Sequence, residues 1–365
     1  MGLTVIPAAE AAATFDSFDA IIDARSPSEH AEDHLPGALN WFVLSDDERR
    51  IVGTRYRQVS AFEARRLGAV MVARNVATHL EREAQDKPPG WRPLVYCWRG
   101  GLRSGTLAWF MDRIGFRTHL VEGGYKAFRA AIVADTTARV PTLDFRVLCG
   151  RTGSGKTRLL QALAAQGAQV LDLESMACHR GSVLGGLPDV PQPSQKAFEM
   201  ALWNRLRQLD PARPVYVESE SQRIGLLRVP EALIERMRRE GRCLDVRMPD
   251  AARVQLLLED YAWFGREPER FCKLLDALVE LRGRETVKRW QAQAHDGQWA
   301  EVFASLMRDH YDPLYLRSMG RQFAGFQTAR VLELPDGGPG SLDQVARGLL
   351  EDAGGRSASP VAAPR

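Results

Sequence analysis

Short apolar runs alternate with stretches of helical spacing along this chain, and this alternation predicts two successive α/β units. In the first part the predicted strands are residues 18–23, 94–97 and 119–122, and residues 106–114 form a predicted helix. In the second part the predicted strands are residues 145–149, 169–173 and 215–218. Strands that alternate with helices indicate a parallel sheet. From about residue 230 to residue 318 the pattern is mainly helical, with few strand signals.

The predicted fold class is therefore α/β, with an N-terminal parallel-sheet domain and a second α/β domain that has a mostly helical C-terminal extension. We place the first domain at residues 1–137, a linker at 138–143, and the second domain at 144–353. Residues 354–365 are mostly Gly, Ser, Ala and Pro, which predicts a disordered tail. A length of 365 residues fits two domains of ordinary size.

Composition narrows the class of protein. With 45% hydrophobic and 26% charged residues the chain is ordinary globular material. No apolar run approaches the ~20 residues of a membrane helix. The five cysteines are never closer than 29 residues apart, so there is no Cys-x-x-Cys pair and we expect free thiols in a reducing cytoplasm. The net charge is only +3, yet the cations are 43 arginines and 6 lysines, and arginine is well suited to phosphate.

The first candidate site is a cysteine that ends a predicted strand and is followed by a glycine-rich loop. The loop residues after Cys97 are Trp98, Arg99, Gly100, Gly101, Leu102 and Arg103. A strand-to-helix turn of this kind directs backbone N–H groups at an oxyanion and stabilises a thiolate. Arg103, at the end of the loop, is placed to fold over a bound anion. The alternative is an inert core thiol, but packing gives no reason for two glycines and two arginines.

The surrounding residues resemble those of rhodanese domains. Residues 23–30 and 34–40 are similar to the opening signature of that family, and Cys97 falls where the family keeps its persulfide-forming cysteine. Residues 122–125 resemble its closing strand and turn. The loop from Cys97 to Arg103 is longer than in common rhodaneses and has the Cys-x5-Arg spacing of phosphatases that share the fold. A wider loop suggests a larger ligand, such as a phosphorus oxyanion.

The second candidate site is a P-loop, which matches Gly-x4-Gly-Lys-[Ser/Thr] in full between a predicted strand and a predicted helix. Its residues are Gly150, Arg151, Thr152, Gly153, Ser154, Gly155, Lys156 and Thr157. The backbone amides hold phosphate oxygens, Lys156 reaches the terminal phosphate, and the Thr157 hydroxyl can bind Mg²⁺. The loop predicts a phosphate site and no particular nucleotide. Glu218 and Glu220, at the end of a later strand, are candidate metal or leaving-group carboxylates, or structural partners of an arginine.

A rhodanese-like domain followed by a P-loop domain resembles the tRNA 2-selenouridine synthase family, with similarity over roughly residues 14–320 in order. The stretches that carry the resemblance are residues 48–56, 171–174, 179–182, 192–196, 218–225 and 310–315. The resemblance implies a transferase that geranylates the wobble 2-thiouridine of tRNA from geranyl diphosphate. It then implies replacement of the geranylated sulfur by selenium from selenophosphate.

The resemblance also assigns roles to the two sites. Cys97 would attack selenium, phosphate would leave, and a Cys97 selanyl intermediate would carry the selenium. The P-loop would bind geranyl diphosphate, with Mg²⁺ as a candidate ion and no prosthetic group. A prenyl pocket is expected from aromatic residues that could equally be ordinary core: Tyr261, Trp263, Phe264, Trp290, Trp299 and Phe303.

For tRNA, the candidate surface lies between residues 48 and 74. This segment contains seven arginines and only two carboxylates, Glu48 and Glu63. The arginines are Arg49, Arg50, Arg55, Arg57, Arg65, Arg66 and Arg74. A solvated helix face is the alternative interpretation. His179, Arg180 and Arg223 are expected near the second site without individual roles.

Two other functions remain open from the residues alone. One is a Cys-x5-Arg phosphatase or sulfurtransferase joined to a P-loop kinase-like domain. The other is a regulatory module in which neither site catalyses a reaction.

Overall fold

The computed structural model describes residues 2–356 and divides into two compact units. One unit holds the chain up to Ala138 together with Ser194–Asn204, and the other holds Arg139–Pro193 and the chain from Arg205 onward. Of the tail predicted at residues 354–365, the part beyond Arg356 lies outside the described residues. Within residues 2–356, no helix has the length and apolar character needed to cross a membrane.

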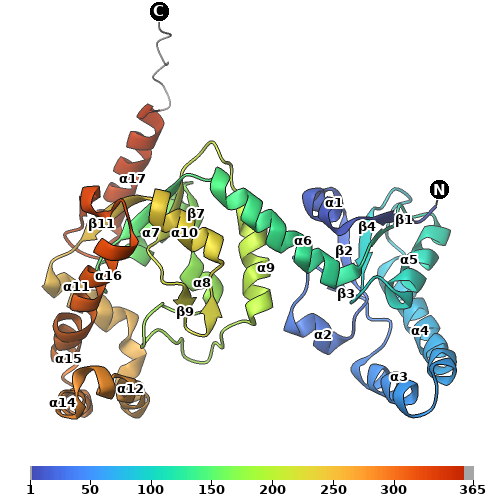
Figure 1. The fold of residues 1–365 in the computed structure, drawn as a ribbon, viewed down its shortest axis with the longest axis horizontal. Coiled ribbons are helices and arrows are strands. Elements are labelled where there is room, and N and C mark those ends of the chain that lie inside the picture. The colour runs from blue at the N-terminus through green and yellow to red at the C-terminus, as the bar shows by residue number, and fades with distance from the viewer. Residues whose placement is uncertain (1, 357–365) are drawn as a thin grey trace, which may run out of the picture. The chain divides into compact units, whose positions relative to one another are not determined.

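The first unit is built on a parallel sheet of five strands in the order β1-β5-β4-β2-β3 (Figure 1). The strands are β1 (Thr4–Ile6), β2 (Ala20–Asp23), β3 (Leu39–Asn40), β4 (Pro93–Tyr96) and β5 (His119–Val121). Successive residues of a strand point to opposite faces. Ile21 accordingly packs into one buried cluster and Ile22 into another.

Helices cover both faces of this sheet. Residues of α1 (Ala8–Ala13) and α6 (Gly124–Arg139) pack into one cluster, and residues of α5 (Leu102–Ile114) pack into the other. The remaining short helix is α2 (Pro27–Glu32). Because both faces are buried, the central strands are apolar on both sides, which explains the continuous apolar runs in the sequence.

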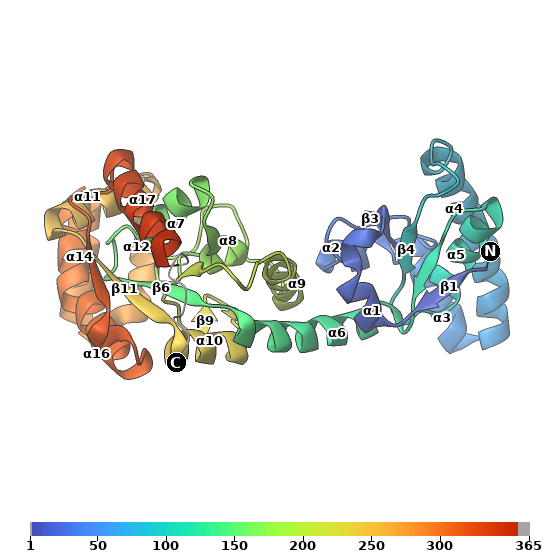
Figure 2. The same ribbon diagram turned by 90° about the horizontal axis from the view of Figure 1, so that it is seen from above.

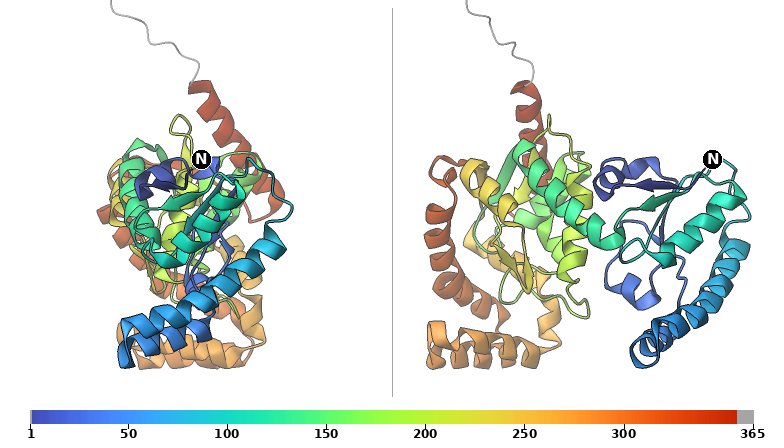
Figure 3. Two further views of the ribbon diagram at one scale, coloured as in Figure 1. Left: turned by 90° about the vertical axis from the view of Figure 1, so that its right-hand side faces the viewer. Right: turned by 45° about the vertical axis from the view of Figure 1, so that its right-hand side comes forward.

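A helical hairpin connects β3 to β4. It consists of α3 (Asp46–Gln58) and α4 (Ala61–Glu83), which pack side by side (Figure 3). Ser45 caps α3 in a capping box with Glu48, and the Ser60 hydroxyl accepts a hydrogen bond from the third amide of α4. The two caps fix the turn of the hairpin at residues 59–60.

The second unit contains another five-stranded parallel sheet, in the order β12-β11-β6-β8-β7. Its strands are β6 (Phe145–Cys149), β7 (Gln169–Leu171), β8 (Val215–Glu218), β11 (Arg242–Arg247) and β12 (Arg330–Glu333). The segment predicted as helical with few strand signals therefore contains β11, which pairs with both β6 and β12. Arg242 and Arg247 at its ends and Asp245 within it interrupt the apolar run that would have marked a strand.

Helices and a small ribbon complete the second unit. The helices α7 (Lys156–Ala165) and α17 (Pro339–Arg356) pack together and share a core with the sheet (Figure 2). The other helices are α8 (Leu173–Ala177), α10 (Glu231–Glu240), α11 (Asp250–Asp260), α12 (Pro268–Leu275), α13 (Val279–Arg282), α14 (Arg284–His295), α15 (Trp299–Leu306) and α16 (Asp312–Gln322). Strands β9 (Arg223–Ile224) and β10 (Leu227–Arg228) form an antiparallel pair. The segment α9 (Gln195–Leu206) contributes Met200 and Trp203 to a core of the first unit.

The fold class predicted from the sequence is confirmed. In each unit the candidate site residues lie at the carboxyl ends of the strands of its own sheet. Strand β4 ends one residue before Cys97, β6 ends one residue before Gly150, and β8 ends at Glu218. Ligands of open parallel sheets bind at the carboxyl ends of the strands, which is where these loops lie.

Candidate functional site

The Cys97 thiol lies at the base of a loop between β4 and the N-terminus of α5. The side chain is 2% exposed, and the Ser104 hydroxyl donates a hydrogen bond to its Sγ at 3.0 Å. Gly101 occupies the N-cap position of α5, so the positive end of the helix dipole faces the loop. A hydrogen-bond donor and a helix N-terminus both favour the negative charge of a thiolate.

A second glycine turn holds the back of this loop. Gly100 has φ +67°, and a Cβ there would stand 2.9 Å from the carbonyl oxygen of Val121. Gly124 has φ +61°, and a Cβ there would stand 2.2 Å from the carbonyl oxygen of Cys97. The Tyr125 amide donates to that same carbonyl at 2.8 Å. The glycines of both segments are therefore required for close packing, which fixes the position of Cys97.

Arg103 is held by a carboxylate. Its Nη1 donates to Glu29 Oε2 at 2.9 Å, and Arg49 Nε lies 3.8 Å from the same oxygen. Burial by itself raises the pKa of Glu29, but the charge and hydrogen bond of Arg103 outweigh it, so this pKa lies below its ordinary value. Glu29 is a residue that sequence reasoning missed, although it lies inside the rhodanese-like segment. It gives Arg103 a defined orientation beside the loop.

The other loop residues differ in exposure. Trp98 is half-buried and stacks on Tyr125 at 5.3 Å, whereas Arg99 and Leu102 are exposed. The loop therefore has one aromatic wall inside the unit and an open rim.

The P-loop wraps the N-terminus of α7. Gly153 and Gly155 have φ +76° and +82°, conformations that favour glycine, and Lys156 is the first residue of the helix. Lys156 Nζ donates to the carbonyl oxygens of Gly150 and Arg151, at 2.7 and 3.3 Å. This geometry is that of a phosphate loop whose lysine curls over its own backbone.

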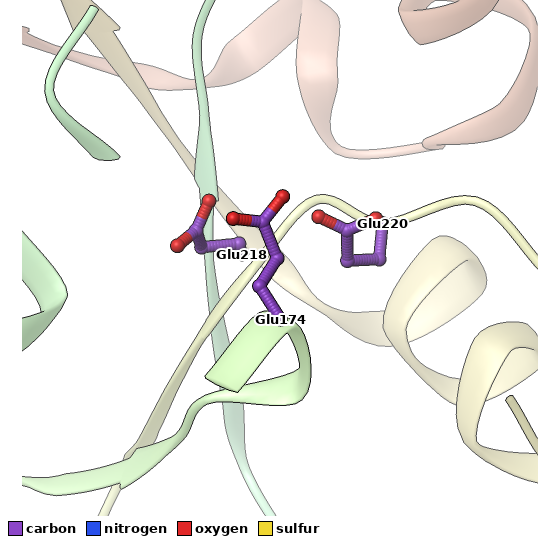
Figure 4. Close-up of side chains that lie close together, drawn as sticks. All are labelled: Glu174, Glu218 and Glu220. Carbon is purple, nitrogen blue, oxygen red and sulfur yellow. The ribbon is translucent and has the colours of Figure 1, made fainter. Parts of the chain in front are cut away.

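Three carboxylates meet beside the P-loop (Figure 4). Glu174 comes from α8, Glu218 from the end of β8 and Glu220 from the loop after it, and one oxygen of each lies within 4.8 Å of the others. Burial and the charge of Glu218 raise the pKa of Glu174 to about 10 and that of Glu220 to about 7. Burial also raises the pKa of Glu218. Glu174 was not predicted, although its stretch, residues 171–174, carried part of the family resemblance.

These carboxylates fit a divalent cation. Glu218 Oε1 is buried and has no hydrogen-bond partner within the described part of the chain. The Thr157 hydroxyl and the charge of Lys156 both lower the pKa of Glu218, so both lie close to that carboxylate. Carboxylate and hydroxyl oxygens are the ligands that Mg²⁺ takes beside phosphates. The chemistry of this arrangement therefore fits Mg²⁺, which Glu174, Glu218 and Glu220 would hold.

A cavity of about 840 Å³ joins the P-loop to the carboxylates and to an apolar wall. The wall includes Leu256, Leu314, Met319 and Phe323. Of the aromatic residues expected around a prenyl group, Tyr261 lines this cavity. Phe264, Trp290 and Phe303 are buried in the helical core instead, and Trp263 and Trp299 pack against that core. His179 and Arg180 line the cavity, whereas Arg223 is not among its lining residues.

The arginine-rich stretch predicted as an RNA surface forms much of the α3–α4 hairpin. All seven arginines are exposed. Arg50 pairs with Asp47 and Arg66 with Glu63, each within a single helix. The stretch is thus both a solvated helix surface and a concentration of positive charge.

Comparison with known proteins gives matches to both units. The model of the tRNA 2-selenouridine synthase AAA domain matches residues 143–273, and that of the rhodanese-like domain matches residues 7–131. A protein of Verminephrobacter eiseniae is 37% identical over 333 residues, 81% of this chain and 87% of that protein. One of Alcanivorax borkumensis is 33% identical over 339 residues, 83% and 90% of the two chains. One of Nitrosomonas europaea is 38% identical over 248 residues, 66% and 63% of the two chains. All three relatives bear the name tRNA 2-selenouridine synthase.

Proposed function

The chain belongs to the tRNA 2-selenouridine synthase family, and we propose that it modifies the wobble 2-thiouridine of tRNA in two stages. Geranyl diphosphate first alkylates the sulfur, and selenium from selenophosphate then replaces the geranylated sulfur. The observation that supports this proposal is the presence in one chain of two different glycine-rich loops, each at the N-terminus of a helix and each suited to an anion. One has a cysteine at its base and the other has an apolar wall beside a phosphate loop.

In the first stage the P-loop amides and Lys156 would hold the diphosphate, and the apolar wall would hold the prenyl chain. The thiouridine sulfur forms a bond to the geranyl carbon while the carbon–oxygen bond to the diphosphate breaks. Bound Mg²⁺ would supply charge neutralisation for the leaving diphosphate. The cavity needs no base-reading group for this substrate, which agrees with the absence of a nucleotide-base motif in the sequence.

In the second stage the Cys97 loop would hold the oxygens of selenophosphate, with Arg103 as the fixed cation. Attack by the thiolate on selenium forms a sulfur–selenium bond and breaks the selenium–phosphorus bond. Selenium in selenophosphate is fully reduced, so the electron pair of the broken bond leaves with phosphorus. The balanced product is therefore phosphite, and not the phosphate expected from the resemblance alone.

The electron balance favours a second route through the same loop. Selenium of the bound selenophosphate attacks carbon 2 of the geranylated base, and geranyl thiolate leaves. Water then cleaves the selenium–phosphorus bond and releases phosphate without any change of oxidation state. In this route Cys97 contacts the anion and forms no covalent bond to selenium.

One experiment tests the proposal and separates the routes. The protein is incubated with selenophosphate, Cys97 is analysed by mass spectrometry, and the phosphorus product is identified by NMR. Selenium on Cys97 together with phosphite supports the covalent route, and phosphate without an adduct supports the direct route. Phosphorylated Cys97 would instead identify a Cys-x5-Arg phosphatase. Purified tRNA is analysed in parallel for geranylated and selenated wobble uridine, and the absence of both would contradict the proposed function.

A further inference from the structure

The turn of the α3–α4 hairpin exposes two aromatic side chains. Tyr56, near the end of α3, is 63% exposed, and Phe62, at the start of α4, is 66% exposed. Val59, in the turn between them, is 56% exposed. Neither aromatic ring contributes to a buried cluster of the described residues. Large apolar side chains that gather on a surface mark a contact with a partner.

Positive charge surrounds these rings. Between Arg49 and Arg74 the only carboxylate is Glu63, whereas the whole chain is only +3, so the rest of the chain is net negative. Within residues 2–356, Arg55, Arg57 and Arg65 have no carboxylate partner. We define the hairpin tip as Tyr56, Phe62 and four neighbouring arginines: Arg55, Arg57, Arg65 and Arg66.

We propose that the hairpin tip binds the unpaired nucleotides of an RNA loop, with bases stacked on Tyr56 and Phe62 and phosphates paired with the arginines. This inference rests on the proposed function, which makes a tRNA anticodon loop the substrate. Aromatic rings beside arginines are the usual means of binding single-stranded RNA, because every base has a face that can stack. A second copy of this chain is a poorer occupant, since a symmetric contact would bring the same arginines together.

The base of the hairpin lies beside the cysteine loop. Arg49 in the first turn of α3 approaches Glu29, which holds Arg103. Tyr56 is two helical turns further along α3, or about 10 Å at 1.5 Å per residue. A loop whose modified base lay at Cys97 would thus present neighbouring nucleotides of the same loop to the hairpin tip.

The test measures binding of an RNA stem-loop that carries 2-thiouridine in its unpaired loop, compared with a fully paired duplex of the same length. We expect the double variant Tyr56→Ala with Phe62→Ala to bind the stem-loop at least about thirtyfold more weakly, with little effect on the duplex. The salt dependence of stem-loop binding should be the same for the double variant as for the unmodified protein. Arg55→Gln with Arg65→Gln should reduce the salt slope by about 0.7 for each phosphate that is no longer neutralised.

Two further variants provide controls. Tyr56→Phe keeps the ring and should bind like the unmodified protein, and Trp109→Ala removes an exposed aromatic ring of the same unit outside the hairpin. Unchanged stem-loop binding by the double variant would overturn the inference, as would a change in its mass in solution, which would identify a contact between copies. If the unmodified protein selenates tRNA but the double variant binds the stem-loop normally, the inference about the hairpin tip is contradicted and the proposed function is supported. If the hairpin tip binds the stem-loop but the protein does not modify tRNA, the inference about the hairpin tip is supported and the proposed function is contradicted.

Discussion

The guanidinium of Arg253 donates hydrogen bonds to both carboxylate oxygens of Asp312, at 2.6 and 2.9 Å. The same guanidinium donates twice to the carbonyl oxygen of Thr152 in the P-loop, at 2.7 and 2.9 Å. Arg253 is 1% exposed, so this cation is removed from water and depends on its partners. Helix α16 is thereby tied to the phosphate loop through a side chain of α11. Asp312 acts on the phosphate site as a positioning residue.

We expect Asp312→Asn to lower the free energy of unfolding by about 3 kcal/mol, because it removes the largely buried carboxylate that pairs with the Arg253 guanidinium and leaves this cation with the exposed Asp250. The P-loop should also bind inorganic diphosphate more weakly, which calorimetry measures. Asp250→Asn is the matched control. Asp250 also contacts Arg253, at 2.8 Å, but it is 71% exposed, and we expect a loss below about 1 kcal/mol. If the two variants lost the same amount of unfolding free energy and diphosphate affinity, the contact between Asp312 and Arg253 would not stabilise the P-loop.

Lys156→Ala should abolish geranylation in vitro and leave the protein folded. Lys156 is half-buried, and its Nζ donates to carbonyl oxygens of its own loop, so its removal opens no core cavity. We expect the variant to lose geranylation of tRNA, which is measured by chromatography of the modified nucleoside. Circular dichroism shows whether the variant is folded. Geranylation at the normal rate would mean that the diphosphate binds elsewhere.

The parts of the fold that were predictable are those with local signals. Strands β4 and β8 are buried on both faces, and β6 departs from this only at the half-buried Arg146, so all three appear as mainly apolar runs. The P-loop follows from its glycine spacing. Strand β11 was missed because Arg242, Asp245 and Arg247 interrupt its apolar residues, and only pairing with β6 and β12 makes it a strand. Periodicity along one segment carries no information about its neighbours in a sheet.

The same limit applies to the sites. Motif spacing located Cys97 and Lys156, but the partners of the motifs come from distant positions. Glu29 reaches Arg103 across 74 positions, and Arg253 reaches Thr152 across 101. The arrangement of Glu174 with Glu218 and Glu220 likewise depends on the order of β7 and β8 in the sheet. These contacts are products of tertiary structure and have no short-range pattern.

Ser104→Ala should slow the reaction of Cys97 with iodoacetamide at neutral pH by about fivefold. The Ser104 hydroxyl is a donor to Sγ at 3.0 Å, and a hydrogen bond of about 1 kcal/mol to the charged form sets that ratio. Alkylation is followed by mass spectrometry of the Cys97 peptide, and Cys97→Ala identifies the signal. An unchanged rate would show that the Ser104 hydroxyl does not contribute to the reactivity of Cys97.

The carboxylate cluster gives the second unit a stability that should fall as the pH rises. Burial and the charge of Glu218 raise the pKa of Glu220 from 4.5 to about 7 and that of Glu174 from 4.5 to about 10. Above pH 4.5 these two carboxyl groups therefore hold more protons in the folded protein than in the unfolded chain, so their contribution to stability is greatest below that pH. It declines until about pH 7 for Glu220 and about pH 10 for Glu174.

We expect Glu220→Gln to make the decline between pH 4.5 and about 7 roughly half as steep, because Glu174 still contributes over that range. The part that is removed is at most about 3 kcal/mol at 1.36 kcal/mol per pKa unit. Urea unfolding at several pH values measures it, with the exposed Glu301→Gln as the control. Mg²⁺ should restore stability to the unmodified protein at pH 8, because a cation replaces the protons that the cluster has lost. The ion should stabilise Glu218→Gln much less, since that variant lacks the oxygen that has no protein partner. If the stability of Glu220→Gln and that of the unmodified protein changed with pH in the same way, the carboxylates would not hold the extra protons. If Mg²⁺ also left the stability of both proteins unchanged, the three carboxylates would not hold a cation.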